Sequence, residues 1–211
     1  MILKGLVVGA LQVNCYILGT GRGGECLVID PGGDVEDIER VLREEALRLK
    51  YILLTHGHVD HVGGVWDLVR RTGGQVLMHR GDLPLLEGVE MQALAFGLPP
   101  TGKPRVDRTI EDGERIEAGE IGVDVLHTPG HSPGGVSYRY DNLLFVGDTL
   151  FAGSVGRTDL PGGSFEELVK SVREKLFPIG DEARVFPGHG PQTTIGTERL
   201  YNPFLRDIDW A

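Results

Sequence analysis

The chain has 211 residues, and its 40% of hydrophobic residues suffice for the core of one domain or of a tight two-layer unit. With 21 basic and 31 acidic residues, its formal net charge is −10. This charge argues against a nucleic-acid partner, because phosphate backbones require clustered Lys and Arg. No apolar run approaches the roughly 20 residues that span a bilayer, and the N-terminus lacks the pattern of a signal peptide. We therefore expect a cytoplasmic protein with no membrane partner.

The two cysteines, Cys15 and Cys26, match no C-x-x-C metal or redox spacing. In a cytoplasmic chain such residues are more often buried thiols than a disulfide. A bridge across the N-terminal hairpin stays geometrically open, but nothing in the sequence requires it. We expect two free, buried thiols.

The N-terminal part of the chain predicts an antiparallel meander followed by a helix. Three β-rich runs separated by Gly-containing turns cover residues 2–8, 12–18 and 25–29. Asp34 is predicted to cap the helix. The apolar face of this helix is predicted to hold Ile38, Val41, Leu42 and Leu49.

A short buried strand is predicted at residues 51–54, and a second helix follows it and ends near residues 73–74. The apolar face of this second helix is predicted from Val62, Val65, Trp66 and Val69. A strand is predicted at 75–78. Residues 81–110 are broken by Pro and Gly and predict a long irregular stretch, of the kind that often forms a lid or substrate loop.

The C-terminal half predicts more strands and one further helix. Strands are expected at 121–126 and 183–186, and a hairpin at 136–140 and 143–146 turns at residues 141–142. Ser164 and Glu167 have the spacing of a capping box for a helix. No repeat, linker or charge run divides the chain.

Residues 56–61 carry the sequence H-x-H-x-D-H directly after the apolar run at 51–54. Exposed polar turns are usually built from Asn, Asp, Ser and Gly rather than from three histidines. Neutral imidazole nitrogens and carboxylate oxygens suit zinc, iron or manganese. The stretch therefore predicts a metal site in a strand-to-helix loop.

Three further loops share the same pattern, in which an apolar strand leads into a ligand-type residue among Gly and Pro. They place His131 after residues 121–126, Asp148 after 143–146 and His189 after 183–186. Because ligand sites gather outside the carboxyl ends of strands, these loops are expected to converge. The remaining histidines, His79 and His127, are predicted to be structural.

The set of His56, His58, Asp60, His61, His131, Asp148 and His189 resembles the metal site of the metallo-β-lactamase superfamily. Asn14-Cys15-Tyr16, the sequences at 127–131, 147–151 and 156–159, and Asn202-Pro203-Phe204-Leu205 are similar to those of glyoxalase II-like hydrolases, in particular of their short form. The resemblance implies an α/β fold, a four-layer αββα sandwich, with the metal site along one edge of the two sheets.

The resemblance also implies two divalent metal ions, zinc most often and iron or manganese otherwise. One ion would be bound by His56, His58 and His131, and the other by Asp60, His61 and His189, with Asp148 between them. Asp60 and Asp148 would serve catalysis, and Asp30 would hold the histidine loop by hydrogen bonds. The implied reaction is attack of a metal-bridging hydroxide on the carbonyl of a small anionic acyl thioester of the hydroxyacylglutathione type.

Full-length glyoxalase II adds a helical C-terminal segment that holds glutathione, whereas 22 residues follow His189 here. We therefore expect one metallo-β-lactamase-type domain over residues 1–211, without that glutathione-binding domain. Arg157 is expected either to face the substrate or to brace its own loop through Asp159. The sequence does not indicate the thiol carrier or the oligomeric state.

Three other functions remain open. A persulfide dioxygenase of the same fold would use a single iron bound by His56, His131 and Asp148. A lactonase is a second alternative. A non-catalytic metal-binding module is a third, although a structural zinc needs only four ligands.

Overall fold

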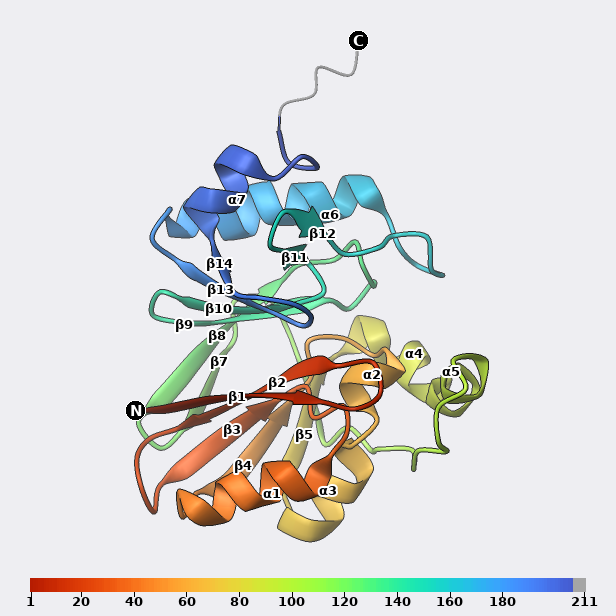
Figure 1. Cartoon of the computed structure of the whole chain (residues 1–211), viewed down its shortest axis with the longest axis vertical. Coiled ribbons are helices and arrows are strands. Elements are labelled where there is room, and N and C mark those ends of the chain that lie inside the picture. The colour runs from red at the N-terminus through yellow and green to blue at the C-terminus, as the bar shows by residue number, and fades with distance from the viewer. Residues whose placement is uncertain (207–211) are drawn as a thin grey trace.

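The computed structural model describes residues 1–206, and two six-stranded sheets form its centre (Figure 1). The predicted domain boundary at residue 211 lies outside the described residues. In the first sheet the strands lie in chain order: β1 (Ile2–Val8), β2 (Val13–Gly19), β3 (Glu25–Ile29), β4 (Arg48–Leu53), β5 (Gln75–His79) and β6 (Arg108–Ile110). The first three are antiparallel, as the meander predicted, and β3 to β6 are parallel.

The second sheet has the order β14-β13-β10-β9-β8-β7. Its strands are β7 (Arg115–Ala118), β8 (Ile121–His127), β9 (Val136–Tyr140), β10 (Leu143–Gly147), β13 (Arg184–Pro187) and β14 (Thr193–Thr194). The pair of β10 and β13 is parallel, so both strands end at the same edge. A small hairpin of β11 (Leu150–Phe151) and β12 (Ser154–Val155) follows β10.

Helices cover the outer face of each sheet, which gives the four layers expected from the sequence (Figure 1). The first sheet is covered by α1 (Val35–Glu44), α2 (Val59–Val62) and α3 (Val65–Thr72). The second is covered by α6 (Phe165–Ser171) and α7 (Ile195–Tyr201), and α6 continues through a π-helical turn at Val172–Leu176 and a 3₁₀ turn at Phe177–Ile179. Three apolar clusters fill the layers: one between the sheets and one under each helical layer. The αββα prediction is confirmed.

Two details of the first helical layer differ from the prediction. Asp34 precedes α1 but makes no capping bond, because its Oδ2 instead accepts a hydrogen bond from the backbone N–H of Gly9 at 2.9 Å. Leu49 lies on β4 rather than on the helix, since α1 ends at Glu44.

The second predicted helix is split into α2 and α3. Gly63 and Gly64 lie between them and pack against the loop after β3, where the Gly64 N–H donates to the Pro31 carbonyl at 2.9 Å. A Cβ at Gly63 would lie 2.7 Å from the carbonyl oxygen of Gly32. The glycines therefore allow this close approach and interrupt the helix at the same time.

The prediction of an irregular stretch at residues 81–110 is wrong at its end, which forms β6, and in its first half. Two helices occur there, α4 (Leu83–Glu87) and α5 (Val89–Ala95), after a 3₁₀ turn at Arg80–Asp82. Pro84 lies in the first turn of α4, where a missing N–H costs no hydrogen bond. Leu86, Val89 and Ala93 share one buried face that packs on the first sheet's cluster.

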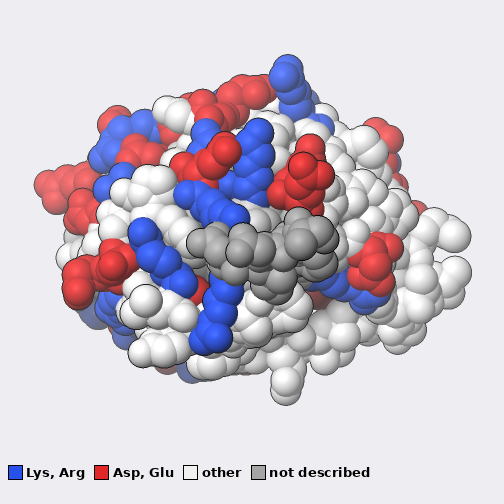
Figure 2. Space-filling model, turned by 90° about the horizontal axis from the view of Figure 1, so that it is seen from above, with Lys and Arg blue, Asp and Glu red and all other residues white. Residues whose placement is uncertain are grey.

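The face formed by α6 and α7 mixes charges of both signs (Figure 2). Arg199 pairs with Asp181 at 3.1 Å, and Lys175 on the turn after α6 pairs with Asp112 at 2.6 Å. These two basic side chains therefore have acidic partners. Within residues 1–206, no helix has the length and apolar character needed to cross a membrane.

Cys15 and Cys26 are free and fully buried, as predicted. Burial raises the pKa of Cys15 well above its usual value and that of Cys26 to about 12, so both stay protonated at neutral pH. Because the thiolate is the nucleophile, we expect no alkylation of the native protein by iodoacetamide at pH 8. In denaturant without reductant, both thiols should react. Mass spectrometry would count the added groups, and rapid labelling of the folded protein would contradict the burial of these residues.

Candidate metal centre

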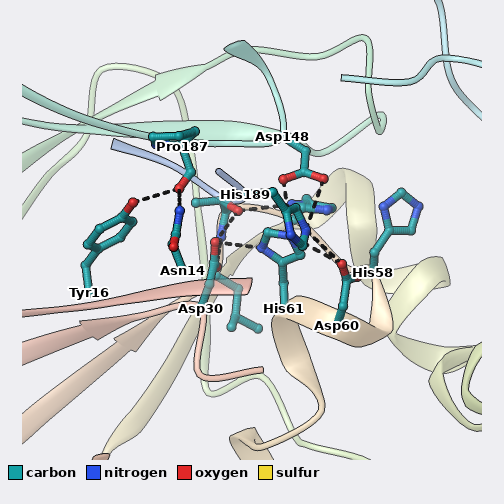
Figure 3. A network of polar contacts seen from close by, with 12 residues as sticks. Asn14, Tyr16, Asp30, His58, Asp60, His61, Asp148, Pro187 and His189 are labelled. Atoms are coloured by element: carbon teal, nitrogen blue, oxygen red, sulfur yellow. Dashed lines mark hydrogen bonds and ion pairs between the residues drawn. The ribbon is translucent and has the colours of Figure 1, made fainter. Parts of the chain in front are cut away.

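A buried carboxylate at the end of β3 organises the histidine loop. Asp30 Oδ1 accepts a hydrogen bond from the backbone N–H of Thr55 at 2.8 Å. Its Oδ2 accepts from Thr55 Oγ1 at 2.6 Å and from His61 Nδ1 at 2.9 Å (Figure 3). Asp30 is 1% exposed and adopts a left-handed φ of 51°. Asp30 thus holds the start and end of the loop and keeps a proton on His61 Nδ1.

The same network orients His56. The Thr55 hydroxyl gives its proton to Asp30, so its oxygen accepts from His56 Nδ1, 3.0 Å away. The Nε2 atoms of His56 and His61 are buried and make no hydrogen bond within the described residues. Two imidazoles therefore direct unpartnered nitrogens toward one point.

Backbone carbonyls orient two further histidines in the same way. His131 Nδ1 donates to the Arg157 carbonyl at 2.8 Å, and His189 Nδ1 donates to the Gln12 carbonyl at 3.3 Å. The Nε2 atoms of both rings then face inward. Such outer partners fix the tautomer of a metal-binding histidine.

All seven candidate residues come together, although they lie on four different loops. His61 Nε2 is 3.3 Å from Asp148 Oδ1, His189 Nε2 is 3.1 Å from Asp60 Oδ2, and His58 Nδ1 is 2.9 Å from His131 Nε2. Ligand-type atoms lie within 4.8 Å of one another in three groups, His56-His58-His131, His56-His61-Asp148 and Asp60-His61-His189. Asp148 lies opposite His61 and His189 in Figure 3.

The donor set fits metal ions. Burial lowers the pKa of His56 well below its usual value, and burial together with His131 lowers that of His58 to about 4. Both rings are therefore neutral at pH 7, the state that binds a metal. Asp148 Oδ1 is a third buried atom without a hydrogen-bond partner within residues 1–206. Buried polar atoms are rarely left unpaired, and cations bound at this centre would give all three a partner.

His61 behaves differently from the other rings. Burial alone would lower its pKa, but Asp148 and Asp30 raise it well above its usual value. Without a cation, His61 therefore carries the positive charge between two carboxylates. A metal ion at Nε2 would replace this proton.

Two residues that support the loops have no role predicted from the sequence. Asp82 is fully buried and accepts hydrogen bonds from the Gly57 N–H at 2.9 Å, from Ser132 Oγ at 2.7 Å and from the Gly134 N–H. It therefore joins the loop of His56–His61 to that of His131. No sequence signal marks it, because it lies where an irregular stretch was predicted.

Gln92 on α5 is the second missed residue. Its side chain accepts from the Val59 N–H at 3.0 Å and donates to the carbonyls of Gly57 and Leu85, at 3.4 and 2.8 Å. Helix α5 thus supports the histidine loop from outside. A lone Gln on an amphipathic helix gives no sequence signal for such a role.

The Asn14-Cys15-Tyr16 sequence holds the loop of His189 from the other sheet. Asn14 Nδ2 donates to the carbonyls of Pro187 and Gly190, at 3.0 and 2.9 Å. The Tyr16 hydroxyl donates to the Pro187 carbonyl at 2.7 Å (Figure 3). The two sheets are therefore linked directly beside the centre.

The two remaining histidines, for which a structural role is expected, lie apart from the seven residues. His79 and His127 stack on each other with ring centroids 4.2 Å apart. His79 Nδ1 accepts from the Gly81 N–H at 3.2 Å, and His127 Nε2 donates to the Pro133 carbonyl at 3.0 Å. Neither belongs to a group of ligand atoms found in the described residues.

A cavity of about 260 Å³ opens over the centre. Its walls include five of the candidate ligands together with Leu11, Phe96, Arg157 and Leu160. Arg157 makes two hydrogen bonds to Asp159, both at 2.7 Å, and lowers the pKa of that carboxyl to about 2. Arg157 therefore both lines the cavity and braces its own loop, with its charge neutralised by Asp159.

A sequence model of the metallo-beta-lactamase superfamily matches residues 8–189, so the chain belongs to this superfamily. A curated relative, hydroxyacylglutathione hydrolase GloC of Haemophilus influenzae, is 39% identical over 94% of this chain and 95% of its own. The solved structure of TTHA1623 in a di-iron-bound form is 43% identical, has a TM-score of 0.87 and covers 96% of this chain and 100% of its own. That of BLEG-1 B3 metallo-beta-lactamase is 38% identical, has a TM-score of 0.90 and covers 97% of this chain and 100% of its own.

Proposed function

We propose that this protein is a glyoxalase II-like thioester hydrolase with a binuclear metal centre. In this proposal, His56, His58 and His131 bind one ion, Asp60, His61 and His189 bind the other, and Asp148 contacts both. The observation that carries the proposal is the convergence of enough ligand atoms for two ions. The similarity to GloC over nearly the whole length of both chains supports the choice of substrate.

Two divalent ions would supply an activated water and would polarise the thioester carbonyl. The donor set of nitrogen and oxygen atoms suits zinc, and also iron or manganese. Because a similar protein has a structure in a di-iron-bound form, iron is also a candidate metal here. The other functional roles belong to the chain's own residues.

Asp60 and Asp148 supply the negative charge that holds two cations together in a buried site. Both carboxyls have a lowered pKa: burial would raise it, but His189 lowers that of Asp60 and His61 that of Asp148. Both are thus ionised at neutral pH and accept protons from water poorly. Their role is therefore to bind the metal ions and to orient the activated water. Asp30, Thr55 and the backbone carbonyls keep the imidazoles in the neutral tautomers that ligation needs.

The competing proposal is a persulfide dioxygenase, which would need only His56, His131 and Asp148 around a single iron. The placement of Asp60, His61 and His189 beside that group supports the binuclear hydrolase. A lactonase would use the same two ions and differs only in its substrate.

The reaction class can be tested with one preparation loaded with zinc and another loaded with iron. We expect S-lactoylglutathione to be hydrolysed by both, with equal rates in the presence and absence of oxygen, because hydrolysis needs no redox-active metal. Release of thiol would be followed spectrophotometrically. A homoserine lactone and nitrocefin serve as comparison substrates. Oxygen consumption with glutathione persulfide, present with iron and lost with zinc, would instead identify the dioxygenase.

A further inference from the structure

A second cavity of about 270 Å³ opens beside the one over the metal centre. The turn at residues 9–11, the glycines at 32–33, the start of α2 and the segment at 98–101 form its walls. It shares Leu11 and Asp60 with the first cavity. The second cavity, named the side slot, therefore adjoins the candidate active site.

Glycine backbone forms much of the side slot. Gly9 adopts a φ of 72°, and a Cβ on Gly33 would lie 2.8 Å from the Cα of Gly9. The β1–β2 turn and the loop after β3 can therefore approach each other closely only without side chains at these positions. The opposite wall comes from residues 98–100, which follow α5 and are Leu-Pro-Pro. The sequence thus leaves a space of about 270 Å³ lined largely by apolar and backbone groups.

The charges around the side slot are all negative. Among residues 1–206, Asp34 and Asp60 are the charged residues that line it, and no Lys or Arg does so. Thr101 contributes a hydroxyl, and its Oγ1 is buried without a hydrogen-bond partner in the part of the chain that the structure describes. An anionic group would be repelled here, whereas an apolar chain with one polar substituent fits.

We infer that the side slot binds the acyl chain of the substrate and makes the enzyme selective for thioesters of unbranched, medium-length acyl groups. This inference rests on the proposed thioester hydrolysis. The carbonyl would lie over the metal centre beside Asp60, the acyl chain would extend past Leu11 toward residues 98–101, and the thiol carrier would lie toward Arg157 and Leu160. An anionic carrier such as glutathione is excluded from the side slot by Asp34.

Binding of the reaction's carboxylate products tests the side slot without turnover. For zinc-loaded protein, isothermal titration with acetate, butyrate and hexanoate should show affinity rising about two- to fourfold for each methylene that leaves water. Ala10→Phe would place a ring in the side slot and should abolish this increase. Ala95→Phe is the matched control, since Ala95 is exposed on α5 and lines neither cavity; this variant should keep the increase.

Pro99→Phe, on the opposite wall, is a second variant that fills the side slot, in case Ala10→Phe does not fold. Circular dichroism would check the folding of both variants. Equal affinities for the three carboxylates in the wild type, or an increase that survives both fillings, would overturn the side-slot inference.

Turnover separates this inference from the proposed function. The kcat/KM values for acetyl, butyryl and hexanoyl thioesters of one neutral thiol should rise with chain length in the wild type and become similar in Ala10→Phe. Turnover without any dependence on chain length would overturn the inference and leave the hydrolase standing. Binding that depends on chain length, without hydrolysis of any thioester, would reject the hydrolase and retain the apolar side slot.

Discussion

Asp148→Ala is expected to lower the metal content from two ions per chain to one or fewer and to reduce thioester hydrolysis more than a hundredfold. The Asp148 carboxylate lies 3.3 Å from His61 Nε2 and 3.7 and 3.8 Å from the Nε2 atoms of His189 and His131. Loss of an outer partner of a metal ligand already costs about 10–100-fold in affinity or activity. Removing a carboxylate that faces both proposed ions should cost more.

Metal content after dialysis would be measured by inductively coupled plasma mass spectrometry, beside kcat/KM for a thioester. His79→Ala is the control, because His79 stacks on His127 away from the seven residues. It should retain both ions. An Asp148→Ala protein with two ions and normal turnover would remove Asp148 from the centre, and metal loss in His79→Ala would place His79 in it.

The strands and the loops that follow them could be predicted from sequence because two signals agree there. Apolar runs such as 51–54 and 143–146 mark buried strands, and Gly or Pro with a polar residue marks the turn at each carboxyl end. The pairs β3–β4 and β10–β13 are parallel, so their ends meet at one edge. Local patterns and sheet topology together therefore bring the seven side chains to one place.

The two helices within residues 81–110 could not be predicted because the sequence signals for them conflict. Pro84 and Gly88 are typical of helix breaks, yet one lies in the first turn of α4 and the other lies between the two helices. The helices are 5 and 7 residues long, too short for their periodicity to outweigh those residues. Packing of Leu86 and Val89 on the core stabilises them instead, and such tertiary contacts are invisible to a local pattern.

The residues that support the metal centre show the same limit of prediction from local sequence patterns. The family resemblance implies that Asp30 holds the histidine loop, and its three hydrogen bonds are those of such a residue. Asp82 has no comparable sequence context. Its partner Ser132 is 50 residues away, so its role depends on how the two sheets are stacked.

Asp82→Ala is expected to reduce the free energy of unfolding by about 3–5 kcal/mol and to weaken zinc binding by about 10–100-fold. The substitution would leave three donors, Ser132 Oγ and the N–H groups of Gly57 and Gly134, without their acceptor. Each buried unpaired group costs about 1–3 kcal/mol, with partial relief from water that enters the space. The zinc effect follows because two loops that carry His56, His58 and His131 would no longer be joined.

Urea denaturation of the metal-free protein and competition with a chelator would measure the two quantities separately. Asp107→Ala is the matched control: the Asp107 carboxylate also accepts a hydrogen bond from a backbone N–H, that of Val76 at 2.8 Å, but it is exposed and distant from the centre along β6. Its loss should cost about 1 kcal/mol or less and leave zinc affinity unchanged. If the two variants behaved alike, the buried carboxylate of Asp82 would not join the two halves of the centre. A large loss of stability with unchanged zinc affinity would restrict Asp82 to folding, because the ligands would then hold their positions without it.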